Sequence, residues 1–271
     1  MPKFDMGAAW EDSVVLLRSH SALTGTIAAV FLFLPTLAVS WFGPVPIQPA
    51  ADASMQQVQA AFLESARAAL PYQLLIALVG AIGGVGVLRL WLSRTGTSVG
   101  DALGFALRMI PTVVAVQILL GAALAIGALV LIMPGAALGG PGGILLLIVG
   151  LVLLVGLCAY FWGRLALVSP VIADRGESNP LAAIRESLAL TKGNGWQIFL
   201  FLFLVTLVVL IAAVLVGGVF AALGGTESGA ARLLSGFVEA GVAAVGGLVS
   251  LAVTAAAYRQ LAAPGRENVF S

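Results

Sequence analysis

Few residues of this chain carry side chains that could do chemistry. Among its 271 residues there is one histidine, His20, and one cysteine, Cys158. A single histidine excludes any site that needs two, and a single cysteine excludes an intramolecular disulfide or a cysteine-clustered metal site. We interpret His20 as an interfacial polar residue and Cys158 as a small packing residue. The sequence therefore predicts no catalytic residue, no cofactor and no bound metal.

One acidic residue lies within an apolar stretch, where a charge is costly and is a functional candidate by default. It is Glu239, seven residues after Arg232. At this spacing the two can share a helix face and form an intramembrane polar pair near the outer end of the last span. The alternative is that Glu239 lines a polar pathway through the membrane.

A group of basic residues surrounds one short amphipathic segment late in the chain. They are Arg164, Arg175, Arg185 and Lys192. Basic side chains beside a membrane attract anionic lipid headgroups, each contributing about 1 kcal/mol. These four are candidates for binding lipid or a protein partner. The alternative is that they only set the orientation of the chain in the membrane.

Composition identifies the environment in which these residues must be placed. The chain is 61% hydrophobic and 9% charged, against roughly 25% charged in an average soluble domain. This excludes a conventional soluble domain and a disordered chain. A net charge of +1 implies no nucleic-acid partner. The expected partners are membrane lipids and, as an alternative, another membrane protein.

Six apolar stretches are long enough to cross a bilayer core about 30 Å thick as helices. Their composition predicts an all-α integral membrane protein with a single transmembrane domain over residues 1–271. The stretches are Ala22–Phe42, Pro71–Leu92, Pro111–Ile132, Ile144–Val168, Ile198–Leu223 and Phe237–Tyr258. The first is too long, and begins too far into the chain, for a cleaved signal peptide.

The distribution of basic residues predicts the orientation. All Lys and Arg residues except Arg67 and Arg232 fall on one side of the six spans, including Arg94 and Arg266. Because basic residues concentrate on the cytoplasmic side, we expect both termini in the cytoplasm of a bacterial cell and the spans in its inner membrane.

A short amphipathic helix is predicted before each odd-numbered span. Ser98 with Asp101 forms a capping box, and Asn179 before Pro180 forms an N-cap. Superposing Ser13, Ala106 and Ser187 gives offsets of 93 and 81 residues, which predicts three helix-pair repeats. The expected apolar stripes are Trp10–Val14–Leu17, Leu103–Leu107–Ile110 and Leu181–Ile184–Leu188.

Several local signals refine the spans and their connections. Ser54–Ala69 is predicted to form a helix outside the membrane, and Met133–Gly143 a tight turn. Pro35 is expected to kink the first span. Gly80 and Gly84 let helices approach closely, either within the bundle or between two copies of the chain.

The stretch Arg164–Leu204 resembles the membrane-domain family of glycerophosphodiester phosphodiesterases. The resemblance is carried by a Ser-Pro-Val stretch, an amphipathic helix ending in Thr-Lys-Gly, and an aromatic residue before the next span; residues 4–23 are similar to the opening helix of that family. The matching positions are Pro170–Val171, Pro180–Leu181, Ala183–Ile184, Ser187, Leu190–Gly193 and Trp196. The resemblance implies a multi-span module linked to membrane lipid or envelope physiology, without the catalytic domain to which some members are fused.

The expected function is therefore non-catalytic. We predict an accessory or scaffold module that binds lipid or a partner through its cytoplasmic interfacial helices. The alternative is a small transporter or permease subunit, with Glu239 facing its pathway. An intramembrane enzyme would need two or more titratable groups gathered in one pocket.

Overall fold

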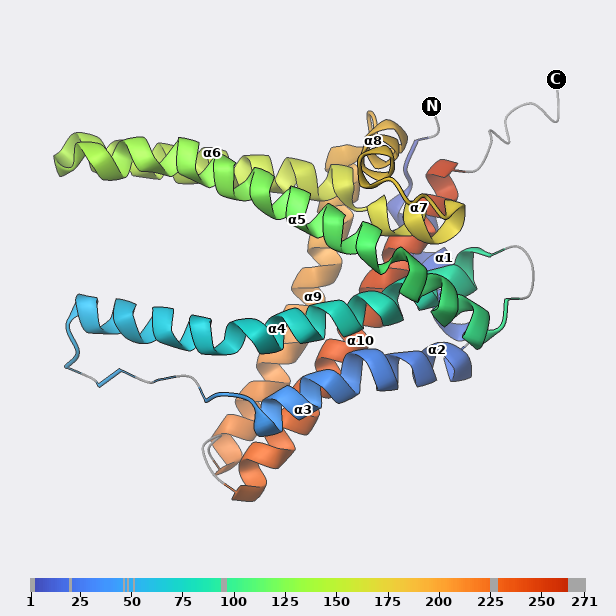
Figure 1. Cartoon of the computed structure of the whole chain (residues 1–271), viewed down its shortest axis with the longest axis horizontal. Helices are drawn as coiled ribbons and strands as arrows, with labels where there is room; N and C mark the ends of the chain where they lie inside the picture. Colours follow the sequence, from blue (N-terminus) through green and yellow to red (C-terminus); the bar gives the residue numbers. More distant parts are fainter. Residues whose placement is uncertain are drawn as a thin grey trace.

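The computed structural model describes residues 3–19, 21–45, 47, 49–50, 52–93, 97–224 and 229–262, and all regular structure within them is helical. His20, Arg94 and Arg266, on which the sequence makes predictions, lie outside the described residues. The elements (Figure 1) are α1 (Met6–Ser19), α2 (Ser21–Ala28), the π-helical turn η1 (Ala29–Phe33), α3 (Leu34–Phe42), α4 (Met55–Leu92), α5 (Val99–Leu138), α6 (Gly140–Leu165), α7 (Val168–Arg175), α8 (Pro180–Leu190), α9 (Gly195–Gly224) and α10 (Gly229–Ala262).

Six helical segments are long and apolar enough to cross a membrane, and each overlaps one of the six predicted stretches. The prediction of an all-helical chain with six candidate spans is therefore confirmed. The segments are Ser21–Phe42, Met55–Leu92, Val99–Leu138, Gly140–Arg175, Gly195–Val219 and Arg232–Ala262.

Two of these helices are longer than the sequence predicts. The helix expected at Ser54–Ala69 and the second span form one helix of 38 residues, α4, which starts with a capping box between Ser54 and Gln57. In the same way, the amphipathic segment before the third span continues into that span as α5, through Pro111. A proline removes only one hydrogen bond of the helix, and in an apolar setting the remaining backbone groups are best satisfied by continuing it.

The connection between α5 and α6 is shorter than the predicted turn. Helix α5 continues through Pro134 to Leu138, and the chain reverses at Gly139 and Gly140, whose φ angles are 60° and 61°. Glycine adopts this left-handed backbone without the steric penalty of a side chain. In the first span, Pro35 follows the π-helical turn η1, in which the N–H of Leu34 bonds to the carbonyl of Ala29.

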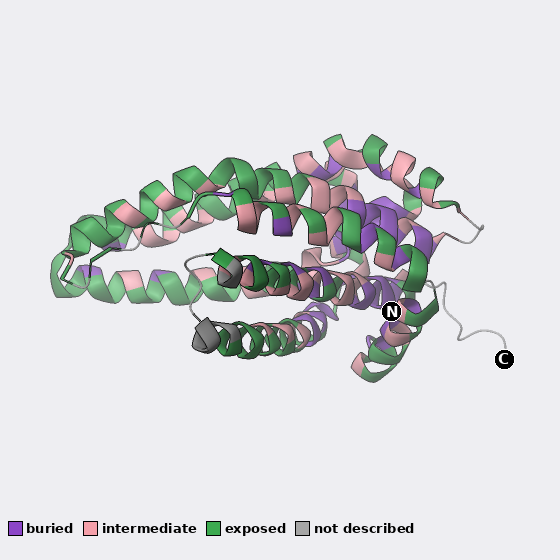
Figure 2. Cartoon of the chain, turned by 90° about the horizontal axis from the view of Figure 1, so that it is seen from below, coloured by how far each residue is buried: buried purple, intermediate pink, exposed green. Residues whose placement is uncertain are grey.

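The buried core lies at one end of the bundle. Here the end of α4, the start of α5, α7 and the end of α10 meet α1 and α8; we call this the basic end, because Arg89, Arg175 and Arg259 lie in it. Figure 2 shows buried residues gathered at this end, while the other ends of the helices diverge and are mostly exposed. In the most apolar part of each span, 44% of residues are buried in α4 and α10, but 6% in the segment that contains α6.

The close approach of α6 to α9 at the basic end can be tested by substitution. Gly163 in α6 is buried, and a Cβ there would overlap the carbonyl oxygen of Gly195 and the backbone of Phe199. We expect Gly163→Ala to destabilise the fold by about 1–3 kcal/mol through overpacking. Gly156→Ala is the matched control, because a Cβ at Gly156 meets nothing within 4 Å. Thermal unfolding of detergent-purified variants measures both; equal midpoints would contradict the described α6–α9 contact.

Candidate functional site

The four basic candidates do not form a single cluster of free charges. Arg185 and Lys192 are exposed, and no described residue pairs with either. Arg175, in contrast, forms an ion pair with Glu186 of α8. Arg164 lies in the last turn of α6. All four are candidates by the sequence pattern, but among them only Arg185 and Lys192 are exposed with no described partner.

The side chain of Arg164 is packed against protein. Its guanidinium lies 5.9 Å from the centre of the Tyr160 ring. A Cβ at Gly195 would overlap its aliphatic carbons, so the glycine leaves space for the arginine. Its Nε is buried and bonds to no described residue. Arg164 therefore fills space between α6 and α9 and presents little charge to the surface.

Helix α8 is positioned by its own N-cap and by the end of α6. The Oδ1 of Asn179 accepts hydrogen bonds from the N–H groups of Leu181 (3.0 Å) and Ala182 (3.4 Å). The buried Ser187 and Thr191 donate from their hydroxyls to the carbonyl of Arg164, at 2.8 and 3.2 Å. A carbonyl at a helix end has no partner within the helix. The two hydroxyls therefore satisfy the end of α6 and fix α8 against it.

Further polar contacts join the other elements of the basic end. Tyr258 of α10 donates to the carboxylate of Asp174 at 2.7 Å. Arg89 donates from Nη1 to the carbonyls of Ala173 and Asp174, both at 2.9 Å, at the C-terminal end of α7. A cation is favourable at that end of a helix. No spacing pattern in the sequence could predict this contact, because the carbonyls that Arg89 meets are more than eighty residues away in the chain.

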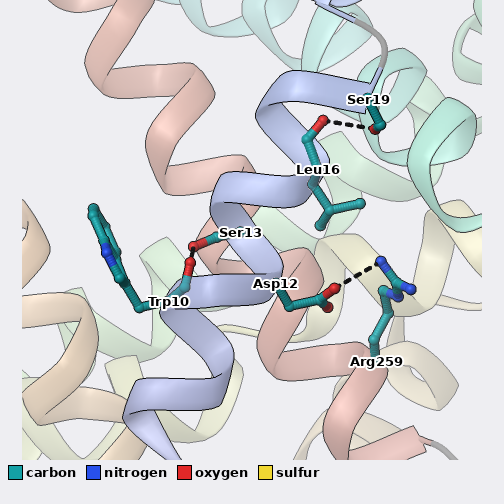
Figure 3. Close-up of polar contacts among 6 residues, drawn as sticks. All are labelled: Trp10, Asp12, Ser13, Leu16, Ser19 and Arg259. Atoms are coloured by element: carbon teal, nitrogen blue, oxygen red, sulfur yellow. Dashed lines mark hydrogen bonds and ion pairs between the residues drawn. The ribbon is translucent and has the colours of Figure 1, made fainter.

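Helix α1 is held against α10 in a similar way. Arg259 forms an ion pair with Asp12 at 3.1 Å, and Ser13 donates to the carbonyl of Trp10 one turn earlier at 2.7 Å (Figure 3). Figure 3 shows that Trp10 and Asp12 leave α1 in different directions, with Asp12 directed toward α10.

The residues of the apolar stripes predicted for the three amphipathic segments are half-buried or exposed. Trp10 is 48% exposed, Leu107 57% and Leu181 51%. The residues fully buried on these segments are small: Ala9 and Ser13 in α1, Ala102 and Ala106 in α5, Ala183 and Ser187 in α8. In lipid no hydrophobic force favours burial of leucine, and helices associate through small residues that permit close contact.

The three segments also share an N-cap at the same position. The side-chain oxygen of Asp5 accepts from the N–H of Ala8 at 3.0 Å, and that of Ser98 from Asp101 at 3.1 Å. With Asn179 these caps are separated by 93 and 81 residues, the offsets found from the sequence. Each cap is followed after four residues by a buried alanine and after eight by a buried serine or alanine.

Arg232 and Glu239 are brought near one another, but the described residues show no ion pair between them. Both instead contact Ser40 of α3. The hydroxyl of Ser40 donates to Glu239 at 3.3 Å, and Nη2 of Arg232 donates to the carbonyls of Ser40 (3.4 Å) and Gly43 (3.3 Å). Trp41 adds a bond from its indole N–H to the carbonyl of Leu233 at 2.9 Å. These residues therefore fasten α10 to the end of α3.

Comparison with known protein families, curated proteins and solved structures gives no match to this chain. Within the described residues, no three His, Cys, Asp or Glu side chains gather as a metal site would require. The fold places the chain in the class of all-helical membrane proteins, with six helices long and apolar enough to span a bilayer.

The hydrogen bonds between α8 and the end of α6 predict an effect on stability. We expect Ser187→Ala/Thr191→Val to lower the free energy of unfolding by about 1–3 kcal/mol, because the buried carbonyl of Arg164 loses both hydroxyl partners. Ser178→Ala is the control, since that side chain is exposed. Chemical denaturation in detergent measures the difference, and a double variant as stable as the control would refute this role.

Proposed function

We propose that this protein is a non-catalytic accessory or scaffold module of the bacterial inner membrane, with both termini in the cytoplasm, that binds anionic lipid headgroups at α8. The observation that carries the proposal is the pair of exposed cations, Arg185 and Lys192, left without a described partner. Neighbouring basic residues are either paired, as Arg175 is, or packed, as Arg164 is. The two remaining charges are available to an external anion.

Aromatic residues beside α8 support a position at the membrane surface. Trp162 and Trp196 are 47% and 63% exposed, and both rings contact Phe199, at 6.1 and 5.1 Å between centres. Tryptophan concentrates at the interface between hydrocarbon and water. Trp196 follows Lys192 by four residues. We therefore expect the two cations to lie at the depth of lipid phosphates, which supports a lipid rather than a soluble partner.

The proposal includes a threefold repeat of helix pairs, each led by an interfacial helix. Its support is the recurrence of an N-cap, a buried alanine and a buried small residue at the same offsets in α1, α5 and α8. In the second unit the interfacial helix is continuous with its span. All three units begin at the basic end, which favours a parallel repeat about the membrane normal.

The resemblance to the glycerophosphodiester phosphodiesterase membrane-domain family remains part of this proposal. Several residues that carry it have a structural role: Ser187 and Thr191 bond to the end of α6, and Gly193 turns the chain with φ of 84°. These are roles in architecture. They support a shared module linked to membrane lipids and assign no reaction.

A transporter is the alternative function, and it requires Glu239 to face a polar pathway. Glu239 is exposed on α10 and its carboxylate contacts Ser40 beside the Trp41–Leu233 bond. These contacts hold α10 against α3, which favours the lipid-binding module over a transporter.

Charge reversal tests the proposed function. We expect Arg185→Glu and Lys192→Glu each to lower the phosphatidylglycerol retained after mild detergent extraction by about fivefold, and the double variant by about 25-fold. Arg67→Glu is the matched control, because Arg67 is an exposed arginine on α4 far from α8. Lipid is measured per mole of protein by mass spectrometry. Retention in the double variant equal to that in the control would reject lipid binding at α8.

Orientation can be tested separately with single cysteines. In a Cys158→Ala background, Arg67→Cys should react with a membrane-impermeant maleimide in intact spheroplasts, because Arg67 is expected on the outer side. Arg185→Cys should react only after the membrane is permeabilised. Both positions are exposed, so accessibility to the reagent depends on the side of the membrane. The opposite labelling pattern would overturn the proposed topology.

A further inference from the structure

A second basic feature lies away from α8, in a groove of about 410 Å³ between the end of α4 and the first turns of α5. It is lined by two arginines, Arg89 and Arg108, with Asp101, Phe105 and the glycines Gly100 and Gly104. These lining side chains come from two helices, and no sequence motif predicts a role for the groove.

Arg89 is held rigidly in this groove. Its Nη1 is fixed by the two carbonyls at the end of α7, and its guanidinium lies 4.5 Å from the centre of the Phe105 ring. No described residue accepts a hydrogen bond from its Nε or Nη2. A guanidinium presents these two groups as a fork that matches two oxygens of a phosphate. The cation is thus positioned before any ligand binds.

The glycines of α5 keep the groove open. A Cβ at Gly104 would meet nothing within 4 Å, and one at Gly100 would meet only Ser98 Oγ at 3.9 Å. Helix packing therefore does not require glycine at either position, although glycine in a helix interior costs about 1 kcal/mol relative to alanine. Gly100, Gly104 and Arg108 follow one another at four-residue intervals and share a helix face. Larger side chains at the two glycines would fill the space beside Arg108.

The charges of the groove favour an anion. Arg108 is exposed and pairs with no described residue. Asp101 is the only acid among the described residues of the lining, and its carboxylate already accepts a hydrogen bond from Ser98 at 2.6 Å. Two guanidinium groups and one carboxylate leave a single positive charge. A phosphate ester with one negative charge, lying beside the apolar ring of Phe105, matches this lining.

We propose that the groove between α4 and α5 binds a phosphate ester, held by the fork of Arg89 and the mobile charge of Arg108. Arg108 lies three residues before Pro111, where the apolar stretch of α5 begins. The phosphate of a membrane lipid lies at this depth, and a soluble phosphate ester has the same chemistry. The site is separate from α8 and does not depend on lipid binding there.

Two substitutions of lining residues test whether the groove binds the ligand. Arg108→Gln removes the free charge. Gly104→Leu fills the groove and replaces glycine with a stronger helix former. Their matched controls are Arg67→Gln, at an exposed arginine of α4, and Gly121→Leu, at another position of α5 where a Cβ meets nothing within 4 Å. All are made in the full chain, with and without Arg185→Glu/Lys192→Glu.

Binding is measured by native mass spectrometry with phosphatidylglycerol, with phosphatidylcholine and with inorganic phosphate, and thermal midpoints check the fold. We expect Arg108→Gln and Gly104→Leu each to weaken phosphatidylglycerol binding about fivefold, in both backgrounds, with the controls unchanged. Inorganic phosphate that binds and displaces the lipid would support the same site with a soluble ligand. If Arg108→Gln fails to fold, the binding measured for Gly104→Leu decides whether the proposal holds.

Unchanged binding of both phosphatidylglycerol and phosphate in folded Gly104→Leu would overturn the proposal. Equal loss of phosphatidylcholine would support the site, because this lipid carries the same phosphodiester and the groove would then recognise the phosphate group rather than the net charge of the lipid. A third outcome separates the two proposals. If Arg185→Glu/Lys192→Glu loses lipid while the groove variants have no effect, lipid binding at α8 is supported and only the groove proposal is rejected.

Discussion

Close contact between small residues is the constraint on which the rest of this structure depends. Ala9, Ala102 and Ala183 are fully buried at equivalent points of α1, α5 and α8. A membrane supplies no hydrophobic force to gather leucines, so contact must come from dispersion between closely approaching backbones. Several large apolar side chains of these helices, among them Trp10, Leu107 and Leu181, are exposed. This explains why the core is confined to the basic end while the other ends of the helices diverge (Figure 2).

Polar side chains at helix ends complete that packing. Arg89 bonds to the end of α7, Arg232 to the end of α3, and Ser187 with Thr191 to the end of α6. Each satisfies a carbonyl that has no partner within its own helix, where water is scarce. These polar and charged residues therefore act as helix caps or as cross-links between helices.

The sequence was sufficient for the features that depend on local patterns. Apolar length predicted the six spans, and the N-caps Ser98 and Asn179 follow from their side chains and spacing. The fully buried small residues could not be found in this way, because alanine and serine give no periodic apolar signal in the sequence. Contacts between distant segments were equally inaccessible: Glu239 contacts Ser40, 199 residues away, and no spacing rule connects them.

The distribution of satisfied charges narrows where the protein can interact. Arg175 and Arg259 pair with carboxylates, Arg89 and Arg232 donate to carbonyls, and Arg164 packs against a ring. The exposed cations that no described residue pairs with are Lys3, Arg18, Arg67, Arg108, Arg185 and Lys192. Side-chain entropy opposes ordering an isolated surface cation, so such residues do little to stabilise the helices around them. Those at the basic end support the proposed anion binding there, because lipid phosphates can supply the negative charge that the protein does not.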